Sequence, residues 1–236
     1  MTDPLSTVFD HMDRWRHLPA YQLERRADLF FSAYLPAVLT AHTGVPVSPD
    51  LLPELPIRRD LIWPDRPTRA SVKVDYVALA ADRSRAFFVE LKTDGASRRD
   101  SQDTYLSRSV EVGFRRILQG IVEISQATSA HQKYGHLLRL LADQGCLRLP
   151  DALAGYLWPT PRPGLSRLLR EIEVTARADE FAIEVIYVQP AAVPGDRCID
   201  FAQFAAHVEQ LGDPLSARFA ASLRRWVERA GAPAPD

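Results

Sequence analysis

Three side chains with complementary chemistry lie close together in one short stretch of the sequence. Asp75, Glu90 and Lys92 are embedded in runs rich in Val, Phe, Tyr and Leu, where a charge needs a partner because its burial is costly. Two neighbouring carboxylates repel each other, and a divalent cation relieves the repulsion by using their oxygens as ligands. An ammonium group beside them can orient or deprotonate a water molecule, or neutralise charge on a phosphate in the transition state. These residue types therefore predict a metal site for chemistry on phosphate esters.

A β-hairpin is predicted to hold these side chains together. Residues 72–79 and 86–92 have the composition of strands, and ADRS between them is a turn signal. If the two central residues of ADRS form the turn, the numbers of cross-strand partners add to 165. One face of the hairpin then pairs Asp75 with Glu90 and Lys73 with Lys92, while the other face is apolar. A wider turn changes the pairing but leaves Glu90 and Lys92 on the same side.

Lysine is scarce in this chain, with three lysines against 26 arginines. Since the chain uses arginine where only positive charge is needed, a lysine indicates a position that requires a compact ammonium group. Two of the three, Lys73 and Lys92, lie within residues 71–92. The competing interpretation is a solvated edge hairpin on which Glu90 and Lys92 are surface charges.

The runs VDYVAL and FFVELKTD resemble the signature of the PD-(D/E)xK nuclease superfamily, in which an acidic residue on one strand precedes D/E-x-K on the next. The matching residues are Asp75, Glu90 and Lys92, and Val74 stands where the literal motif has proline. The resemblance covers roughly residues 21–125. It implies a restriction-endonuclease-like mixed sheet flanked by helices, with Asp75 and Glu90 as metal ligands and Lys92 as the catalytic lysine.

Further roles implied by the resemblance fall on the flanking helices. Members of the superfamily often carry another acidic residue on the preceding helix, for which Glu24 is the best match as a metal ligand and Asp28 the alternative. In several branches a Gln or Tyr on the following helix approaches the site, although the spacing here matches no branch closely. The predicted nucleic-acid contacts are Lys73, Arg98, Arg99, Gln102 and Tyr105.

The remaining sequence predicts an α/β domain with a mixed central sheet and a helical C-terminal extension. Residues 1–230 are expected to form a single nuclease-like domain, with its core at 21–190 and C-terminal helices at 200–230, before a disordered tail at 231–236. Helices are expected at 5–18, 21–42 with a kink or break at Pro36, 101–128, 130–144, 166–173 and 201–229 with a break near 212–214. Strands are expected at 55–63, 72–79, 86–92, 155–158 and 182–189.

Composition limits the classes of protein to be considered. The 29 basic and 30 acidic residues balance, so DNA binding requires a local basic surface. Cys146 and Cys198 have no CxxC spacing and are expected to be reduced, part-buried thiols of a cytoplasmic protein. The six histidines form no HxH or HExxH pattern, and no apolar stretch approaches the length of a membrane span.

The sequence therefore predicts an Mg²⁺-dependent nuclease that hydrolyses phosphodiester bonds in DNA, with Mn²⁺ as a substitute metal. The resemblance implies products with a 3′-hydroxyl and a 5′-phosphate. RNA as substrate and a homodimer are left open, and no membrane partner is expected. One alternative is a catalytically inactive nuclease-fold module that binds nucleic acid or a protein partner. A weaker alternative, an α/β enzyme for a small molecule, lacks support because the chain has no Gly-rich phosphate loop or nucleophile elbow.

Overall fold

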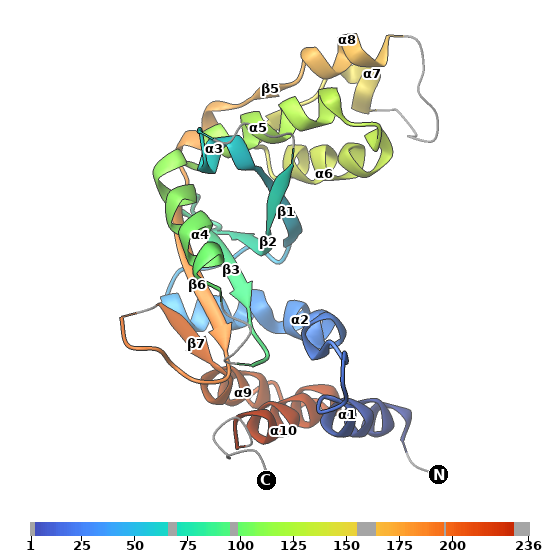
Figure 1. Ribbon diagram of the computed structural model, residues 1–236, viewed down its shortest axis with the longest axis vertical. Helices are drawn as coiled ribbons and strands as arrows, with labels where there is room; N and C mark the ends of the chain where they lie inside the picture. The colour runs from blue at the N-terminus through green and yellow to red at the C-terminus, as the bar shows by residue number, and fades with distance from the viewer. Residues whose placement is uncertain (1–2, 66–69, 95–98, 155–163, 196, 229–236) are drawn as a thin grey trace. The chain divides into compact units, whose positions relative to one another are not determined.

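The computed structural model describes residues 3–65, 70–94, 99–154, 164–195 and 197–228. A five-stranded sheet has the strand order β1-β2-β3-β6-β7, and β4 and β5 form a separate two-stranded sheet (Figure 1). Because β1 is antiparallel to β2 whereas β6 is parallel to β7, the larger sheet is mixed, as predicted. The strands are β1 (Leu52–Arg58), β2 (Ser71–Leu79), β3 (Arg85–Leu91), β4 (Leu147–Arg148), β5 (Glu173–Val174), β6 (Ala182–Gln189) and β7 (Cys198–Asp200).

Helices connect these strands, which confirms the α/β class. They are α1 (Pro4–Trp15), α2 (Leu23–Thr43), α3 (Arg59–Ile62), α4 (Asp100–Val112), α5 (Phe114–Ala127), α6 (His131–Asp143), α7 (Asp151–Ala154), α8 (Leu165–Arg170), α9 (Phe201–Glu209) and α10 (Pro214–Glu228), with the 3₁₀ helix η2 (Ala176–Asp179). Residue contacts divide the chain into two compact units. The first unit is Met1–Leu51, Val89–Gln102 and Val185–Asp236, and the second is Leu52–Phe88 and Asp103–Glu184.

The first unit is built around an aromatic core between α1, α2, α9 and α10. The ring of Phe31 on α2 lies 5.4 Å from Phe201, 5.1 Å from Phe204 and 5.1 Å from Phe219, measured between ring centroids. Phe9 of α1 is fully buried and also contacts Phe219, at 5.9 Å. Aromatic rings bury large apolar areas, so these contacts fix the N-terminal and C-terminal helices to each other within the unit.

The second unit contains the β1–β2 ladder, against which α5 packs. β1 starts at Leu52 and gives way to α3 at Arg59, so the strand predicted at 55–63 was placed too late along the chain. Two prolines, Pro53 and Pro56, lie inside β1. A sheet tolerates proline on an edge strand because one side of that strand has no ladder to donate to, and β1 is an edge strand of the sheet.

The turn between β2 and β3 has the register that the hairpin prediction requires. The backbone N–H of Ala80 donates to the carbonyl of Arg85 at 2.9 Å, and residue numbers 80 and 85 add to 165. Arg83 adopts a left-handed φ of 65°, and its N–H donates to the carbonyl of Ala80 at 2.9 Å. The Asp82 carboxylate accepts hydrogen bonds from the backbone and hydroxyl of Ser84. The turn signal in the sequence therefore set the register at the turn correctly.

Several predicted helix boundaries need correction. The helix predicted at 101–128 is two helices, α4 and α5, because Gly113 between them has a φ of 79° that ends the first. α2 continues through Pro36, so a break there was wrong. The helix predicted at 166–173 ends at Arg170, and Glu173 belongs to β5. The predicted strand 155–158 and the tail 231–236 lie outside the described residues, and β7 had not been predicted.

The remaining predicted elements are confirmed within a few residues. They are the helices at 5–18 and 130–144, the two C-terminal helices separated near Gly212, and the strands at 72–79, 86–92 and 182–189. Both cysteines are unpaired by disulfide and buried, and burial raises the pKa of the Cys146 thiol to about 11, despite the opposing effect of Arg177. In the described part of the chain, no helix combines the length and apolar character needed to span a bilayer.

Candidate functional site

The site is centred on a buried ion pair between Glu90 and Lys92 at the end of β3. Lys92 Nζ lies 2.7 Å from Glu90 Oε1, and the two residues are only 4% and 1% exposed. Their spacing of two residues puts both side chains on one face of the extended chain. The backbone N–H of Lys92 donates to the carbonyl of Val188 on β6 at 2.8 Å, which fixes the end of the strand. The interpretation of these residues as solvated surface charges is therefore wrong.

Gln102, at the start of α4, contacts the same carboxylate oxygen. Its Nε2 donates to Glu90 Oε1 at 2.7 Å, so this oxygen accepts hydrogen bonds from both Lys92 and Gln102. The amide oxygen of Gln102 is buried and has no hydrogen-bond partner among the residues that the structure describes. An unsatisfied buried acceptor is costly, so this oxygen is suited to a donor supplied by a ligand or a water molecule.

A cleft of about 580 Å³ opens above the ion pair within the first unit. Lys92 and Gln102 line it together with Glu24 and Arg25 from the first turn of α2, Asp94 after β3, and Arg99. Arg16 and His17, which follow α1, complete the charged part of the wall. The lining contains four cationic side chains against two acidic ones, with histidine counted as neutral. The balanced charge of the whole chain thus conceals a local excess of positive charge here.

The structure separates the two acidic residues predicted on α2. Glu24 lines the cleft with Lys92. The carboxylate of Asp28 instead accepts a hydrogen bond from the backbone N–H of Leu29, at 2.7 Å. Glu24 is therefore the better placed of the two to act as an auxiliary acid, as the sequence had favoured.

Asp75 is part-buried on β2, between the buried residues Val74 and Tyr76. It belongs to the second unit, and its pairing with Glu90 stays a prediction. The described residues contain no group of three or more His, Cys, Asp or Glu side chains arranged to hold a metal ion. Mg²⁺ is commonly held by only one or two carboxylates together with water and substrate phosphate, so the proposed ligand set does not require such a group.

Two of the predicted nucleic-acid contacts belong to the second unit. Lys73 is exposed and forms an ion pair with Glu54 at 2.5 Å. Tyr105 is 6% exposed, and its hydroxyl donates to the carbonyl of Lys73 at 2.9 Å. The Tyr105 side chain therefore anchors the backbone of β2. Of the other predicted contacts, Arg99 and Gln102 line the cleft, whereas Arg98 lies outside the described residues.

Sequence reasoning missed the contribution that the segment after α1 makes to this cleft. Arg16, His17 and Tyr21 line it. The signal was the run RWRHLPAY, which interleaves aromatic and basic residues as nucleic-acid-binding surfaces do. The segment lies far from the motif in the sequence, and it had been considered only as a short helix.

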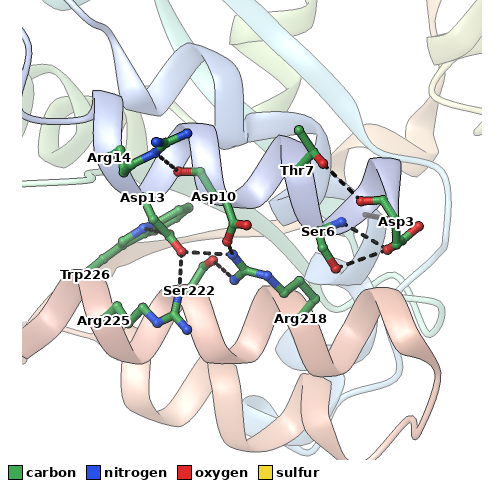
Figure 2. Close-up of polar contacts among 10 residues, drawn as sticks. All are labelled: Asp3, Ser6, Thr7, Asp10, Asp13, Arg14, Arg218, Ser222, Arg225 and Trp226. Carbon is green, nitrogen blue, oxygen red and sulfur yellow. Dashed lines mark hydrogen bonds and ion pairs between the residues drawn. The ribbon is translucent and has the colours of Figure 1, made fainter. Parts of the chain in front are cut away.

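Asp13 fixes the position of α1 on α10 within the first unit (Figure 2). Its Oδ1 accepts from Trp226 Nε1 at 2.8 Å, and its Oδ2 lies 2.8 Å from Arg225 Nη1 and 3.0 Å from Arg218 Nη2. Burial acts to raise the pKa of Asp13, but hydrogen bonds from Arg218, Ser222 and Trp226 outweigh it, so the pKa lies below its ordinary value. The ionised Asp13 thus holds the helix whose end forms the cleft wall.

Comparison of the chain with protein-family models, curated proteins and solved structures finds no significant match. The PD-(D/E)xK likeness therefore rests on the motif residues themselves.

Proposed function

We propose that the chain is a divalent-metal-dependent nuclease of restriction-endonuclease-like fold that hydrolyses phosphodiester bonds in DNA. The observation that carries the proposal is the buried Glu90–Lys92 pair, whose lysine lines a cleft together with Glu24. The D/E-x-K spacing, the mixed sheet and the acidic residue on the preceding helix agree with the motif resemblance.

Burial of this pair is difficult to explain by stability alone. Transferring two charges out of water costs several kcal/mol per ion, and apolar residues of similar volume often stabilise a protein more than a buried ion pair does. Perturbed or costly charges that line a cleft are characteristic of functional sites. A chemical role for Lys92 accounts for the retention of this charge at a place where the surrounding strand is apolar.

The side chains at the site fit a hard cation such as Mg²⁺. Glu90 and Glu24, both of the first unit, are the proposed ligands, and their carboxylates offer oxygen atoms, which Mg²⁺ and Mn²⁺ accept. The buried acceptor oxygen of Gln102 would be satisfied by a coordinated water molecule. When bound, the cation lowers the pKa of such a water and stabilises charge on the scissile phosphate.

The protein's own contribution is to hold a fixed positive charge beside the reacting phosphate. Glu90 orients the Lys92 ammonium, and Gln102 in turn holds the Glu90 carboxylate. Because Glu90 and Lys92 are already desolvated and held in position, little reorganisation is needed when negative charge develops on the phosphate oxygens. Lys92 would neutralise that charge or orient the attacking water molecule.

Cleavage assays with a matched pair of lysine variants test this proposal. Linear, circular and single-stranded DNA, with an RNA oligonucleotide of the same sequence, are incubated with the protein and Mg²⁺, Mn²⁺ or EDTA. We expect metal-dependent cleavage that falls about 10²- to 10⁴-fold in Lys92→Ala, the range for losing a group that transfers a proton or stabilises charge. Lys133→Ala removes an exposed lysine on α6 and should cleave as the unaltered protein does.

Two outcomes would overturn the proposal. One is the absence of cleavage under all of these metal conditions, and the other is equal cleavage by Lys92→Ala. Metal-independent binding of DNA without cleavage would instead support the inactive nuclease-fold module. Preferential cleavage of RNA would keep the reaction and change its substrate.

A further inference from the structure

An exposed group of stacked rings lies at the C-terminal end of α1. Trp15 is the last residue of α1 and is 41% exposed, which is unusual for so large an aromatic side chain. The His11 ring stacks on the indole, with centroids 4.1 Å apart and planes inclined by 14°. Tyr21 meets the indole edge-on at 6.2 Å. His11, Trp15 and Tyr21 are called the Trp15 surface below.

The Trp15 surface continues into the cleft of the candidate site. Tyr21 belongs to both, because it lines the cleft together with Lys92. Arg16 and His17, which directly follow Trp15, line the cleft as well. Arg26 lies over the Tyr21 ring at 4.7 Å, so another guanidinium borders the stacked rings. Aromatic faces and cationic groups therefore alternate from the exposed indole to the buried lysine.

The backbone beneath the Trp15 surface is firmly held. The Asp13 contacts to Arg218, Arg225 and Trp226 fasten the last turns of α1 to α10 (Figure 2). Arg16 Nη2 also donates to the carbonyl of Trp226 at 3.2 Å. A ring that is ordered before a ligand binds loses less conformational entropy on binding, so a rigid exposed indole is well suited to stacking.

From this arrangement we infer that the Trp15 surface binds an unpaired base of single-stranded nucleic acid, whose backbone enters the cleft along Arg16, Arg25 and Arg99. The inference rests on the proposed nuclease function, and it specifies single-stranded DNA or a single-stranded end as the substrate. Within a duplex each interior base already stacks on both sides, whereas an unpaired base of a single strand offers a free face to an indole. Proteins that bind single strands combine such aromatic rings with a cationic groove.

The chemistry of the surface favours nucleic acid over a protein partner. Val8 and Leu18 near Trp15 are exposed as well, but the adjoining cleft has four cationic side chains against two acidic ones. A polyanion complements that excess, and each phosphate contact adds to affinity in a salt-dependent manner.

Binding is tested in EDTA, where no metal-dependent cleavage occurs, by fluorescence anisotropy with a labelled 12-residue oligothymidine. The comparison ligands are a blunt 12-base-pair duplex and an abasic oligonucleotide that keeps the phosphates without the bases. We expect Trp15→Leu to weaken oligothymidine binding about tenfold, equivalent to about 1.4 kcal/mol, and Trp15→Phe to weaken it less. Trp63→Leu, a part-buried tryptophan of the second unit, is the matched control and should leave the affinity unchanged.

The abasic oligonucleotide isolates the stacking interaction. The protein should bind it more weakly than oligothymidine. The unaltered protein and Trp15→Leu should bind it with equal affinity. Equal affinity for oligothymidine and duplex, or unchanged oligothymidine binding by Trp15→Leu, would overturn the inference. Self-association that light scattering detects and that Trp15→Leu abolishes, without an effect on oligothymidine, would show a protein interface instead.

The two proposals fail separately in these assays. Loss of cleavage activity with retained Trp15-dependent binding would remove the nuclease proposal and leave single-strand recognition in place. Cleavage that depends on Lys92 but favours intact duplex, and is indifferent to Trp15, would remove only the recognition proposal.

Discussion

Replacing Lys92 by methionine tests whether the ion pair is as deeply buried as the structure has it. The change keeps an unbranched side chain of similar length and removes only the ammonium group. It leaves the carboxylate of Glu90, which is 1% exposed, without the cation that lies 2.7 Å away. Breaking a buried pair in this way costs about 3–5 kcal/mol. Because Gln102 still donates to Glu90, we expect the lower end, about 3 kcal/mol.

The expected loss is measurable as a change in melting temperature. For a chain of this size each kcal/mol shifts the melting temperature by about 2–4 °C, so Lys92→Met should melt about 6–12 °C lower. Glu90→Gln leaves the ammonium group without its carboxylate and should lose a similar amount. The double variant has no uncompensated charge, and we expect it to lie within about 1 kcal/mol of the unaltered protein. Together with the unaltered protein, the two single variants and the double variant form a double-mutant cycle, whose coupling energy measures the interaction between Glu90 and Lys92.

Mg²⁺ distinguishes a metal site from a purely structural pair in the same assay. In Lys92→Met the carboxylate of Glu90 remains, so Mg²⁺ should raise the melting temperature. A cation present at about a hundred times its Kd stabilises the folded state by about 2.7 kcal/mol. The double variant should show no such rise. A loss below about 1 kcal/mol in Lys92→Met would refute the burial argument, and an Mg²⁺ response that persists in Glu90→Gln would refute the role of this carboxylate.

Two further predictions concern residues outside the ion pair. Asp13→Asn should lower the free energy of unfolding by about 2 kcal/mol at pH 7, because it loses charge-assisted hydrogen bonds to Arg218 and Arg225. Since the folded-state pKa of Asp13 lies below its usual value of 3.8, the stabilisation is present above that value and is lost as the pH falls through the lowered pKa. Urea unfolding should therefore show a smaller difference in the free energy of unfolding between the unaltered protein and Asp13→Asn at pH 3 than at pH 7. An equal difference at the two pH values would contradict this prediction. Gly145→Ala should cost about 1–3 kcal/mol, because Gly145 has a φ of 71° and the Arg177 guanidinium, which donates to the carbonyl of Gln144, would have to move away from the added Cβ. Gly44 has a φ of 70° and open space around the added atom, so Gly44→Ala should lose only the free energy of holding alanine at a positive φ. An equal loss of unfolding free energy in the two variants would show that the contact with Arg177 costs nothing.

The parts of the site that could be predicted from sequence are those set by local geometry. Alternation along a strand places Glu90 and Lys92 on one face whatever the rest of the chain does, and the ADRS signal fixed the Ala80–Arg85 register at the turn. The apolar residues around the pair then indicated its burial. No tertiary information was needed for these features.

The parts that could not be predicted depend on contacts between distant segments. The segment after α1 lines the cleft, and the end of α1 is held by the contact between Asp13 and Trp226, which are separated by 213 residues and joined by no local pattern. β7 has three residues, too few for a periodic signal, and its pairing with β6 defines it. The break between α4 and α5 was predictable in principle from Gly113, but the apolar spacing continues across it and favoured a single helix.

The choice of lysine at position 92 bears on why the pair exists. Most of the described ion pairs that join separate elements use arginine, as in Arg218 with Asp13 and Arg115 with Asp179, whereas Lys73 with Glu54 joins β2 to β1. A guanidinium suits that task because it binds several acceptors in fixed directions. Lys92 instead binds a carboxylate two residues away on its own strand, so their contact connects no distant parts of the fold. A buried pair that costs desolvation and contributes little to tertiary structure requires another reason for its presence, and the proposed chemistry on a phosphate bound in the cleft would supply that reason.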